Sequence, residues 1–198
     1  MPKLILASSS PRRSELLASL GLEFSIVPST VPEPAYNGET PADYGKKLAM
    51  AKATSVALEV PEGLVIGADT IVVLDGQVLG KPQDPAEARE MLTRLSGQTH
   101  TVYTGIAVVD AKTREIAAET VETQVTFRSL SKEEIDDYVA SGEPLDKAGA
   151  YGIQRLGGLL VSRINGCYFN VVGLPLSALD RLLKRFDYAI LLQRRDNH

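Results

Sequence analysis

The sequence predicts a mixed α/β protein in which a bent sheet is flanked by helices and two lobes enclose a cleft. Two observations carry this prediction. Short apolar runs alternate with capped amphipathic helices, and long β-rich segments follow one another in the middle of the chain. With 198 residues, 44% of them hydrophobic, the chain can bury a sizeable core. We expect residues 1–198 to form a single domain, with residues 194–198 frayed.

The chain opens with a strand and then a helix whose first turn carries two arginines. Residues 3–8 form a short apolar run, and Ser10 and Gly21 are the N-cap and the stop signal of the helix that follows. Arg12 and Arg13 lie where unpaired amides and the helix dipole disfavour cations. Two interpretations stay open: the arginines bind an anion such as phosphate, or they point into water or pair with carboxylates.

The remaining elements follow from caps, turn residues and β-rich runs. A strand at 23–29 leads into a proline-rich turn that contains Glu33, and a helix begins after Thr40. A hairpin at 63–83 turns at Asp75 and Gly76. Further along, we expect helices at 84–97, 131–142 and 176–186, long strands at 99–110 and 114–130, and a closing hairpin of strands at 157–164 and 167–175.

Composition narrows the function classes. The net charge is −4, so no general basic surface for nucleic acid or for an anionic membrane is expected. The single cysteine, Cys167, excludes an internal disulfide, and two histidines make no zinc cluster, so any metal would be a hard ion held by oxygens. No apolar run is as long as a membrane span and no signal-peptide pattern opens the chain, which predicts a cytoplasmic protein.

Asp69 is the most informative single residue, because it interrupts the apolar run at 64–73. A carboxylate there is costly unless it is paired, binds a metal or faces a cleft. Across the predicted hairpin, Lys81 returns to about the level of Asp69, which predicts a pair suited to phosphate and metal. The alternative for Asp69 is a bulge at Gly67 and Asp69 that directs the acid outward. The alternative for Asp69 with Lys81 is an ordinary ion pair on the surface.

The segment 142–154 is unusually rich in glycine. It combines Glu143, Asp146 and Lys147 with three glycines, so that a ligand can approach the backbone closely. Gln154 offers an acceptor and donors, as the reading of a nucleobase edge requires. An ordinary charged surface loop is the alternative, but loops this long and rich in glycine usually have a function.

Five segments, in this order, resemble the motifs of the Maf family of nucleoside triphosphate pyrophosphatases. They are LILASSSPRRSELL, GADTIVVLDGQVLGKP, LSGQTHTVYTG, EPLDKAGAYGIQ and NVVGLPL, and together they cover almost the whole chain. The resemblance implies an α/β fold with an elongated cleft, similar to that of inosine triphosphate pyrophosphatases. It also implies hydrolysis of a nucleoside triphosphate to the monophosphate and pyrophosphate, a divalent metal such as Mg²⁺ or Mn²⁺, and a homodimer.

The resemblance assigns catalytic and phosphate-binding roles. Asp69 matches the catalytic acid of the family, which acts as general base on the attacking water. Lys52 and Lys81 match its catalytic cations, and Arg13 matches a phosphate-binding cation. Ser8 falls on the serine of the first motif. On this basis Arg12 and Arg13 would lie at a helix N-terminus to which the triphosphate binds, so the anion offsets the unfavourable dipole.

A metal site is implied by the same resemblance. Glu33 matches an acidic cleft residue, and we expect Glu33 and Asp146 to hold the ion together with Asp69. Pro32 stands where the family often has an acid before the glutamate, which changes how Glu33 is presented.

Substrate choice is implied by three further positions. The branch that resembles dTTP/UTP pyrophosphatases has an arginine, a threonine and a glutamine where this chain has Arg12, Thr70 and Gln154. The 7-methyl-GTP branch tends to have an aromatic residue and a glutamine at the first two positions, and this chain has neither. Arg155 is a departure, because the dTTP/UTP branch often has glycine there.

Two other functions are compatible with these motifs. One is a non-catalytic regulator that senses nucleotides in cell division or septum formation, which would not require Asp69. The other is a pyrophosphatase that prefers 7-methyl-GTP or inosine triphosphate. Release of pyrophosphate from a panel of nucleotides discriminates among the three.

Overall fold

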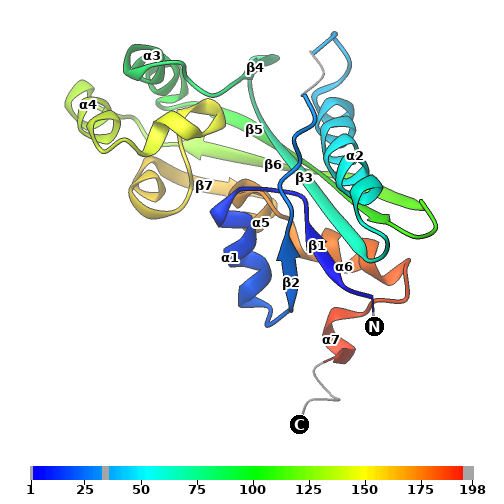
Figure 1. The fold of residues 1–198 in the computed structure, drawn as a ribbon. Helices are drawn as coiled ribbons and strands as arrows, with labels where there is room; N and C mark the ends of the chain where they lie inside the picture. Colours follow the sequence, from blue (N-terminus) through cyan, green and yellow to red (C-terminus); the bar gives the residue numbers. More distant parts are fainter. Residues whose placement is uncertain (1, 33–35, 194–198) are drawn as a thin grey trace. The chain divides into compact units, whose positions relative to one another are not determined.

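The computed structural model describes residues 2–32 and 36–193 and has the predicted mixed α/β architecture (Figure 1). In this part of the chain, seven strands form one sheet in the order β2-β1-β3-β5-β6-β7, with β4 paired to β3. Glu33 and the tail at 194–198, for which the sequence predicts fraying, lie outside the described residues.

Up to the end of α4, the bounds of the described elements agree with the sequence signals to within a few residues. The strands are β1 (Leu4–Leu6), β2 (Phe24–Ile26), β3 (Leu64–Leu74), β4 (Gln77–Leu79), β5 (Thr99–Asp110), β6 (Ile116–Phe127) and β7 (Val161–Asn165). The α-helices are α1 (Pro11–Ser19), α2 (Pro41–Glu59), α3 (Pro85–Leu95), α4 (Lys132–Ala140), α5 (Tyr168–Val172), α6 (Leu176–Lys184) and α7 (Ile190–Gln193). Three short 3-10 helices are η1 (Glu143–Asp146), η2 (Ala148–Ala150) and η3 (Arg155–Leu160).

The chain forms two compact units. Unit 1 comprises Met1–Asp69, Thr104–Val121 and Gly173–His198, and unit 2 comprises Thr70–Tyr103 and Glu122–Val172. Strands β3, β5 and β6 each contribute residues to both units. Among the described helices, none has both the length and the apolar character needed to cross a membrane.

Unit 1 contains the parallel part of the sheet and helix α2. Strand β1 pairs in parallel with both β2 and β3, so that Leu4 lies opposite Phe24 on one side and Leu64 on the other. Helix α2 begins as predicted, because the Thr40 hydroxyl accepts a hydrogen bond from the Asp43 amide at 3.1 Å.

Helix α2 lies unusually close to the sheet, beside β3 (Figure 1). A Cβ atom at Gly67 would lie 2.4 Å from the Ala49 carbonyl oxygen and 2.8 Å from the Ala53 nitrogen. A Cβ atom at Gly105 would lie 2.1 Å from the carbonyl oxygen of Gly45. Helix and sheet therefore meet through glycine and alanine, and backbone atoms rather than long side chains set their separation.

Unit 2 contains the β3–β4 hairpin and helices α3 and α4. Asp75 and Gly76 have φ values of 49° and 76°, which confirms the predicted turn with two left-handed residues. The Asp84 carboxylate caps α3, and Ser131 and Glu134 form a capping box at the start of α4. The two helices cover a core that includes residues from β4, β5, β6 and the segment 148–160.

The predicted closing hairpin is wrong in its second strand, and its first strand is confirmed only in its C-terminal half. Residues 167–175 contain helix α5 instead of a strand, and only Val161–Asn165 of the preceding segment is extended. The Thr123 hydroxyl accepts a hydrogen bond from the Cys167 amide at 3.0 Å. The fully buried Asn170 donates to the Val102 carbonyl at 3.0 Å and to the Thr123 hydroxyl at 2.9 Å. These side-chain bonds hold the segment where a strand ladder was predicted.

We predict that Gly67→Ala lowers the free energy of unfolding by about 1–3 kcal/mol, because the added methyl group overlaps the backbone of α2. Urea denaturation of the purified variant measures this change. Gly80→Ala is the matched control, since a Cβ atom at Gly80 meets no atom within 4 Å in the described structure. Equal stability of the two variants would contradict the close approach of α2 to β3.

Candidate functional site

Asp69 and Lys52 form an ion pair between strand β3 and helix α2. The Lys52 Nζ lies 2.5 Å from the Asp69 Oδ1, and the two side chains are only 17% and 14% exposed. The pair follows from the packing of α2. Ala53 contacts the backbone at Gly67, so the neighbouring Lys52 comes level with Asp69, two residues further along the same face of β3. The outward-directed acid, which the sequence left as an alternative, is not what the structure has.

Lys81 is not on the strand ladder that was predicted to bring it level with Asp69. Strand β4 ends at Leu79, which pairs with Val72. The next carbonyl, that of Gly80, accepts a hydrogen bond from the Gly149 amide at 3.0 Å, so the chain leaves the ladder toward the glycine-rich segment. The cation that pairs with Asp69 comes from a helix instead, and the role of Lys81 stays a prediction.

The first turn of α1 carries the two arginines, as the sequence predicts. Arg13 donates from Nε to the Gly173 carbonyl at 2.9 Å and from Nη1 to the Ser8 hydroxyl at 3.2 Å. The Ser8 hydroxyl also accepts from the Ser10 amide at 3.2 Å. In the described chain Ser10 is the N-cap residue by position only, since its side chain does not cap the helix. Ser8 and Arg13 thus fix the loop between β1 and α1, and Arg12 follows Pro11 in the first turn.

In unit 2, the glycine-rich segment 142–154 folds into the two short 3-10 helices η1 and η2, and η3 follows it directly. Lys147 donates to the Glu143 carbonyl and to the Asp146 carboxylate, each at 2.5 Å. Asp146 is therefore paired already, although its side chain is 67% exposed. Gln154 precedes η3 and is half-buried, whereas Arg155 is exposed and has a φ of 53°. Glycine adopts this left-handed conformation more easily than arginine does, which is the physical reason why a glycine would suit position 155.

The described residues contain no ready-made cluster of metal ligands. In residues 2–32 and 36–193, no three or more His, Cys, Asp or Glu side chains group in a way that could hold an ion. Glu33, one of the three predicted ligands, is outside this range.

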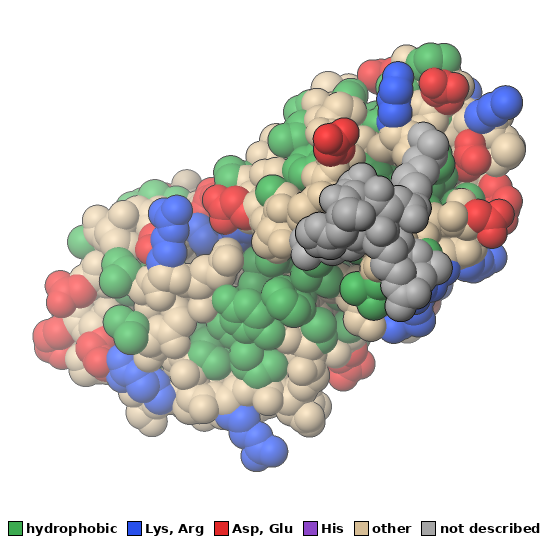
Figure 2. All heavy atoms as spheres, turned by 90° about the horizontal axis from the view of Figure 1, so that it is seen from below, with side chains coloured by type: hydrophobic (Ala, Val, Ile, Leu, Met, Phe, Trp, Pro, Cys, Tyr) green, Lys and Arg blue, Asp and Glu red, His purple; other side chains and the backbone are tan. Residues whose placement is uncertain are grey.

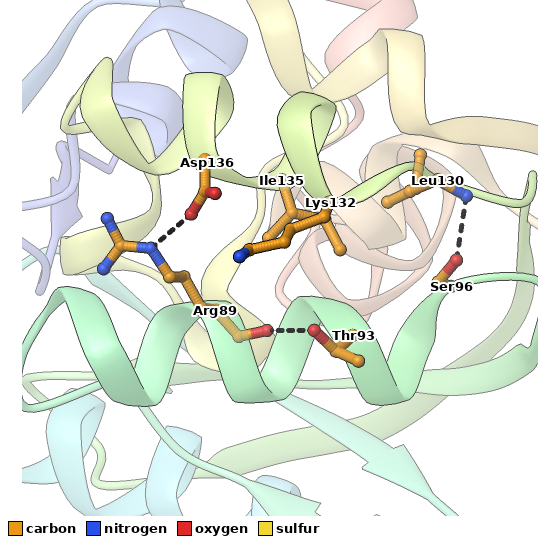
Figure 3. A pocket seen from close by; sticks show the side chains of 7 residues that line it. All are labelled: Arg89, Thr93, Ser96, Leu130, Lys132, Ile135 and Asp136. Atoms are coloured by element: carbon orange, nitrogen blue, oxygen red, sulfur yellow. Dashed lines mark hydrogen bonds and ion pairs between the residues drawn. The ribbon is translucent and has the colours of Figure 1, made fainter.

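A cavity of about 480 Å³ lies between α3 and α4 (Figure 3). Arg89 and Asp136 form an ion pair at 2.6 Å on one side of it, and Leu130 and Ile135 add apolar surface. Its other lining residues are Thr93, Ser96 and Lys132. The cavity contains no residue that the sequence singles out for chemistry, so it does not bear on the catalytic prediction.

Comparison with known proteins decides the family. Residues 3–186 match the family described as Maf-like protein. The chain belongs to the Maf family. Three similar proteins are each named dTTP/UTP pyrophosphatase. That of Moorella thermoacetica is 57% identical over 94% of this chain and 96% of its own. Those of Pelotomaculum thermopropionicum and Symbiobacterium thermophilum are 50% and 51% identical, each over 96% of this chain and over 100% and 97% of their own.

This Maf chain has a buried polar pair that the sequence reading missed. His100 is 2% exposed, and its Nε2 lies 2.7 Å from the Tyr151 hydroxyl oxygen. The His100 ring packs edge-to-face on the rings of Phe127 and Tyr151, with centroids 5.1 and 5.2 Å away. Burial lowers the pKa of His100 to about 4. The only signal in the sequence was the position of His100 and Tyr151 within two of the five motifs.

We predict that this Maf chain loses stability between pH 6.5 and pH 4. His100 takes up a proton more readily in the unfolded chain, because its pKa falls from 6.5 to about 4 on folding. The free energy of unfolding therefore decreases as the pH falls through this window, by about 3 kcal/mol in total. Urea denaturation at a series of pH values measures the slope.

His100→Gln is the control for this prediction, because glutamine can bond to Tyr151 without titrating. We expect a shallower pH dependence in the variant than in the wild type. Equal slopes would show that His100 does not carry the effect.

Proposed function

We propose that this chain is a nucleoside triphosphate pyrophosphatase that hydrolyses dTTP and UTP to the monophosphate and pyrophosphate. The names of relatives that are 50–57% identical over nearly the whole chain support the substrates. The observation that carries the chemistry is the ion pair of Asp69 and Lys52, because it holds a mostly buried carboxylate in one orientation. Modified pyrimidine nucleotides belong to the same proposed substrate class.

The proposed reaction is attack of water on the α-phosphorus. Asp69 accepts a proton from the water as the new bond between oxygen and phosphorus forms. The bond from the α-phosphorus to the bridging oxygen breaks, and its electron pair leaves with pyrophosphate. Lys52 holds Oδ1 of Asp69 at 2.5 Å and so orients the carboxylate toward the water.

Cationic side chains bind the phosphates in this proposal. Arg13 lies at the N-terminus of α1, where backbone amides also attract an anion. Its bonds to Ser8 and Gly173 restrict the guanidinium before substrate arrives, which lowers the entropy lost on binding. Arg12 and Lys81 are proposed to contact the same phosphates, and positive charge there stabilises the leaving pyrophosphate.

A divalent cation, Mg²⁺ or Mn²⁺, is proposed as the cofactor. Mg²⁺ is often held by one or two carboxylates and completed by substrate phosphates, so it does not need the cluster of three ligands that the described residues lack. Asp69 is the first proposed ligand and Glu33 the second. Asp146 is a weaker candidate, because Lys147 pairs with it. The ion would supply electrostatic stabilisation of the phosphate oxygens.

We propose that Arg12, Thr70 and Gln154 select the nucleobase of the substrate. The half-buried Gln154 precedes η3, and its amide can both donate to and accept from a pyrimidine edge. Thr70 follows Asp69 directly on β3.

We also propose a cytoplasmic homodimer. The dimer is supported by large hydrophobic side chains that are 40–67% exposed in unit 2, namely Leu156, Leu159, Tyr168 and Phe169. Figure 2 shows hydrophobic side chains gathered on part of one face of the molecule. The cytoplasm is proposed because it holds nucleoside triphosphates. No nucleic acid is proposed as a partner, since the net charge is −4.

We predict that Asp69→Asn lowers kcat for dTTP by about 10²- to 10⁴-fold, because the amide cannot take the proton, with a much smaller change in nucleotide affinity. Pyrophosphate release from dTTP, UTP, CTP, GTP, ITP and 7-methyl-GTP, with Mg²⁺ or Mn²⁺, measures activity. Calorimetric titration measures affinity.

Asp75→Asn is the matched control, since Asp75 is exposed at the tip of the same hairpin. Wild-type turnover by Asp69→Asn would overturn the catalytic assignment. Nucleotide binding without any pyrophosphate release by the wild type would favour the regulatory alternative. A preference for 7-methyl-GTP or ITP would overturn only the substrate assignment.

We predict that Gln154→Ala lowers the preference for dTTP over dCTP by about tenfold, because one polar edge of the base loses its partner. The ratio of kcat/KM for the two nucleotides measures this preference. Gln124→Ala, at an exposed position of β6, is the control. An unchanged ratio in Gln154→Ala would remove Gln154 from the proposed specificity residues.

A further inference from the structure

The side chain of Lys147 is much more buried than is usual for a lysine. Its side chain is only 15% exposed, although lysine usually extends into water. The ammonium donates to the Glu143 carbonyl and to the Asp146 carboxylate, each at 2.5 Å. These two acceptors stand at the first and last residues of η1, so the head of the side chain is fixed at both ends of that turn.

The stem of Lys147 lies against Gly152. A Cβ atom at Gly152 would be 2.9 Å from both Cδ and Cε of Lys147, so the missing side chain at 152 provides the space that the stem fills. The Gly152 amide also donates a long hydrogen bond, 3.4 Å, to the hydroxyl of the buried Tyr138. The backbone at Gly152 is therefore enclosed by Lys147 and Tyr138.

The chain beyond Gly152 turns back on itself, and its backbone atoms come into close contact. A Cβ atom at Gly157 would lie 2.0 Å from the Gly152 carbonyl oxygen, and one at Gly158 would lie 2.9 Å from the Ile153 carbonyl oxygen. Gln154 stands inside this turn, and the left-handed Arg155 follows it. A shift of Gly152 is therefore passed directly to the backbone that presents Gln154.

We propose that Lys147 is a positioning residue for substrate discrimination. Its stem supports Gly152, and Gly152 fixes the turn from which Gln154 reads the pyrimidine edge. This inference rests on the proposed function, because it concerns the base that the same site selects. Lys147 does not touch the substrate, so its removal acts through Gln154 on selectivity.

The test measures kcat/KM for dTTP and dCTP in Lys147→Ala and in Gly152→Ala. The first variant removes the support, and the second adds a methyl group that displaces the flexible stem. We expect the ratio of the two constants to fall about tenfold in each variant, with folding verified by circular dichroism. Should Lys147→Ala fail to fold, Gly152→Ala alone decides the outcome.

The double variant shows whether the two residues act through one contact. In Lys147→Ala with Gly152→Ala, the new methyl group occupies space that the stem has left, so the two effects on the ratio should not multiply. Lys132→Ala, at an exposed lysine on α4 in the same unit, is the control and should keep the wild-type ratio.

Two results would overturn the inference, and they have different meanings. A wild-type preference for dTTP that persists in both folded single variants would overturn the role of Lys147 alone. A wild-type protein that hydrolyses dTTP and dCTP equally well would overturn the proposed substrate choice and this inference with it.

Discussion

The close approach of helix α2 to the sheet is the constraint on which the candidate site depends. Gly67 meets Ala49 and Ala53, and Gly105 meets Gly45, so at these two positions no side chain larger than a methyl group separates the helix from the strands. Burial of the surrounding apolar side chains, which include Val56 of the helix and Val65 of the strand, stabilises unit 1. The same contact puts a lysine of the helix beside an aspartate of the strand, so packing and chemistry have one structural origin.

The ion pair of Asp69 and Lys52 would be a poor source of stability on its own. Two mostly buried charges lose much of their hydration, and their attraction does little more than offset that loss. The ion pair instead fixes the orientation of the Asp69 carboxylate, because a carboxylate held by one oxygen cannot rotate freely. Hydrogen bonds also orient a charged group in the loop between β1 and α1, because Ser8 and Gly173 hold the guanidinium of Arg13.

Much of the fold could be predicted because its signals are local. Caps, prolines and turn glycines placed α2, α3, α4 and the β3–β4 hairpin within a few residues. Interactions between distant segments could not be predicted. The helix at α5 depends on Thr123, more than forty residues away, and the partner of Asp69 depends on how a helix docks. The motifs led to the right family, but only the structure relates Lys147 to Gly152.

The contact of glycine and alanine residues between α2 and β3 fixes the distance between the helix and the strand. At Gly67 and Gly105 an added side-chain carbon would overlap the backbone of α2 and push the two elements apart. The gap between an acid on the strand and a base on the helix is then spanned by side-chain length alone. Aspartate with lysine fits that gap, so a longer acid on the strand would require a shorter base on the helix to keep the same ion pair.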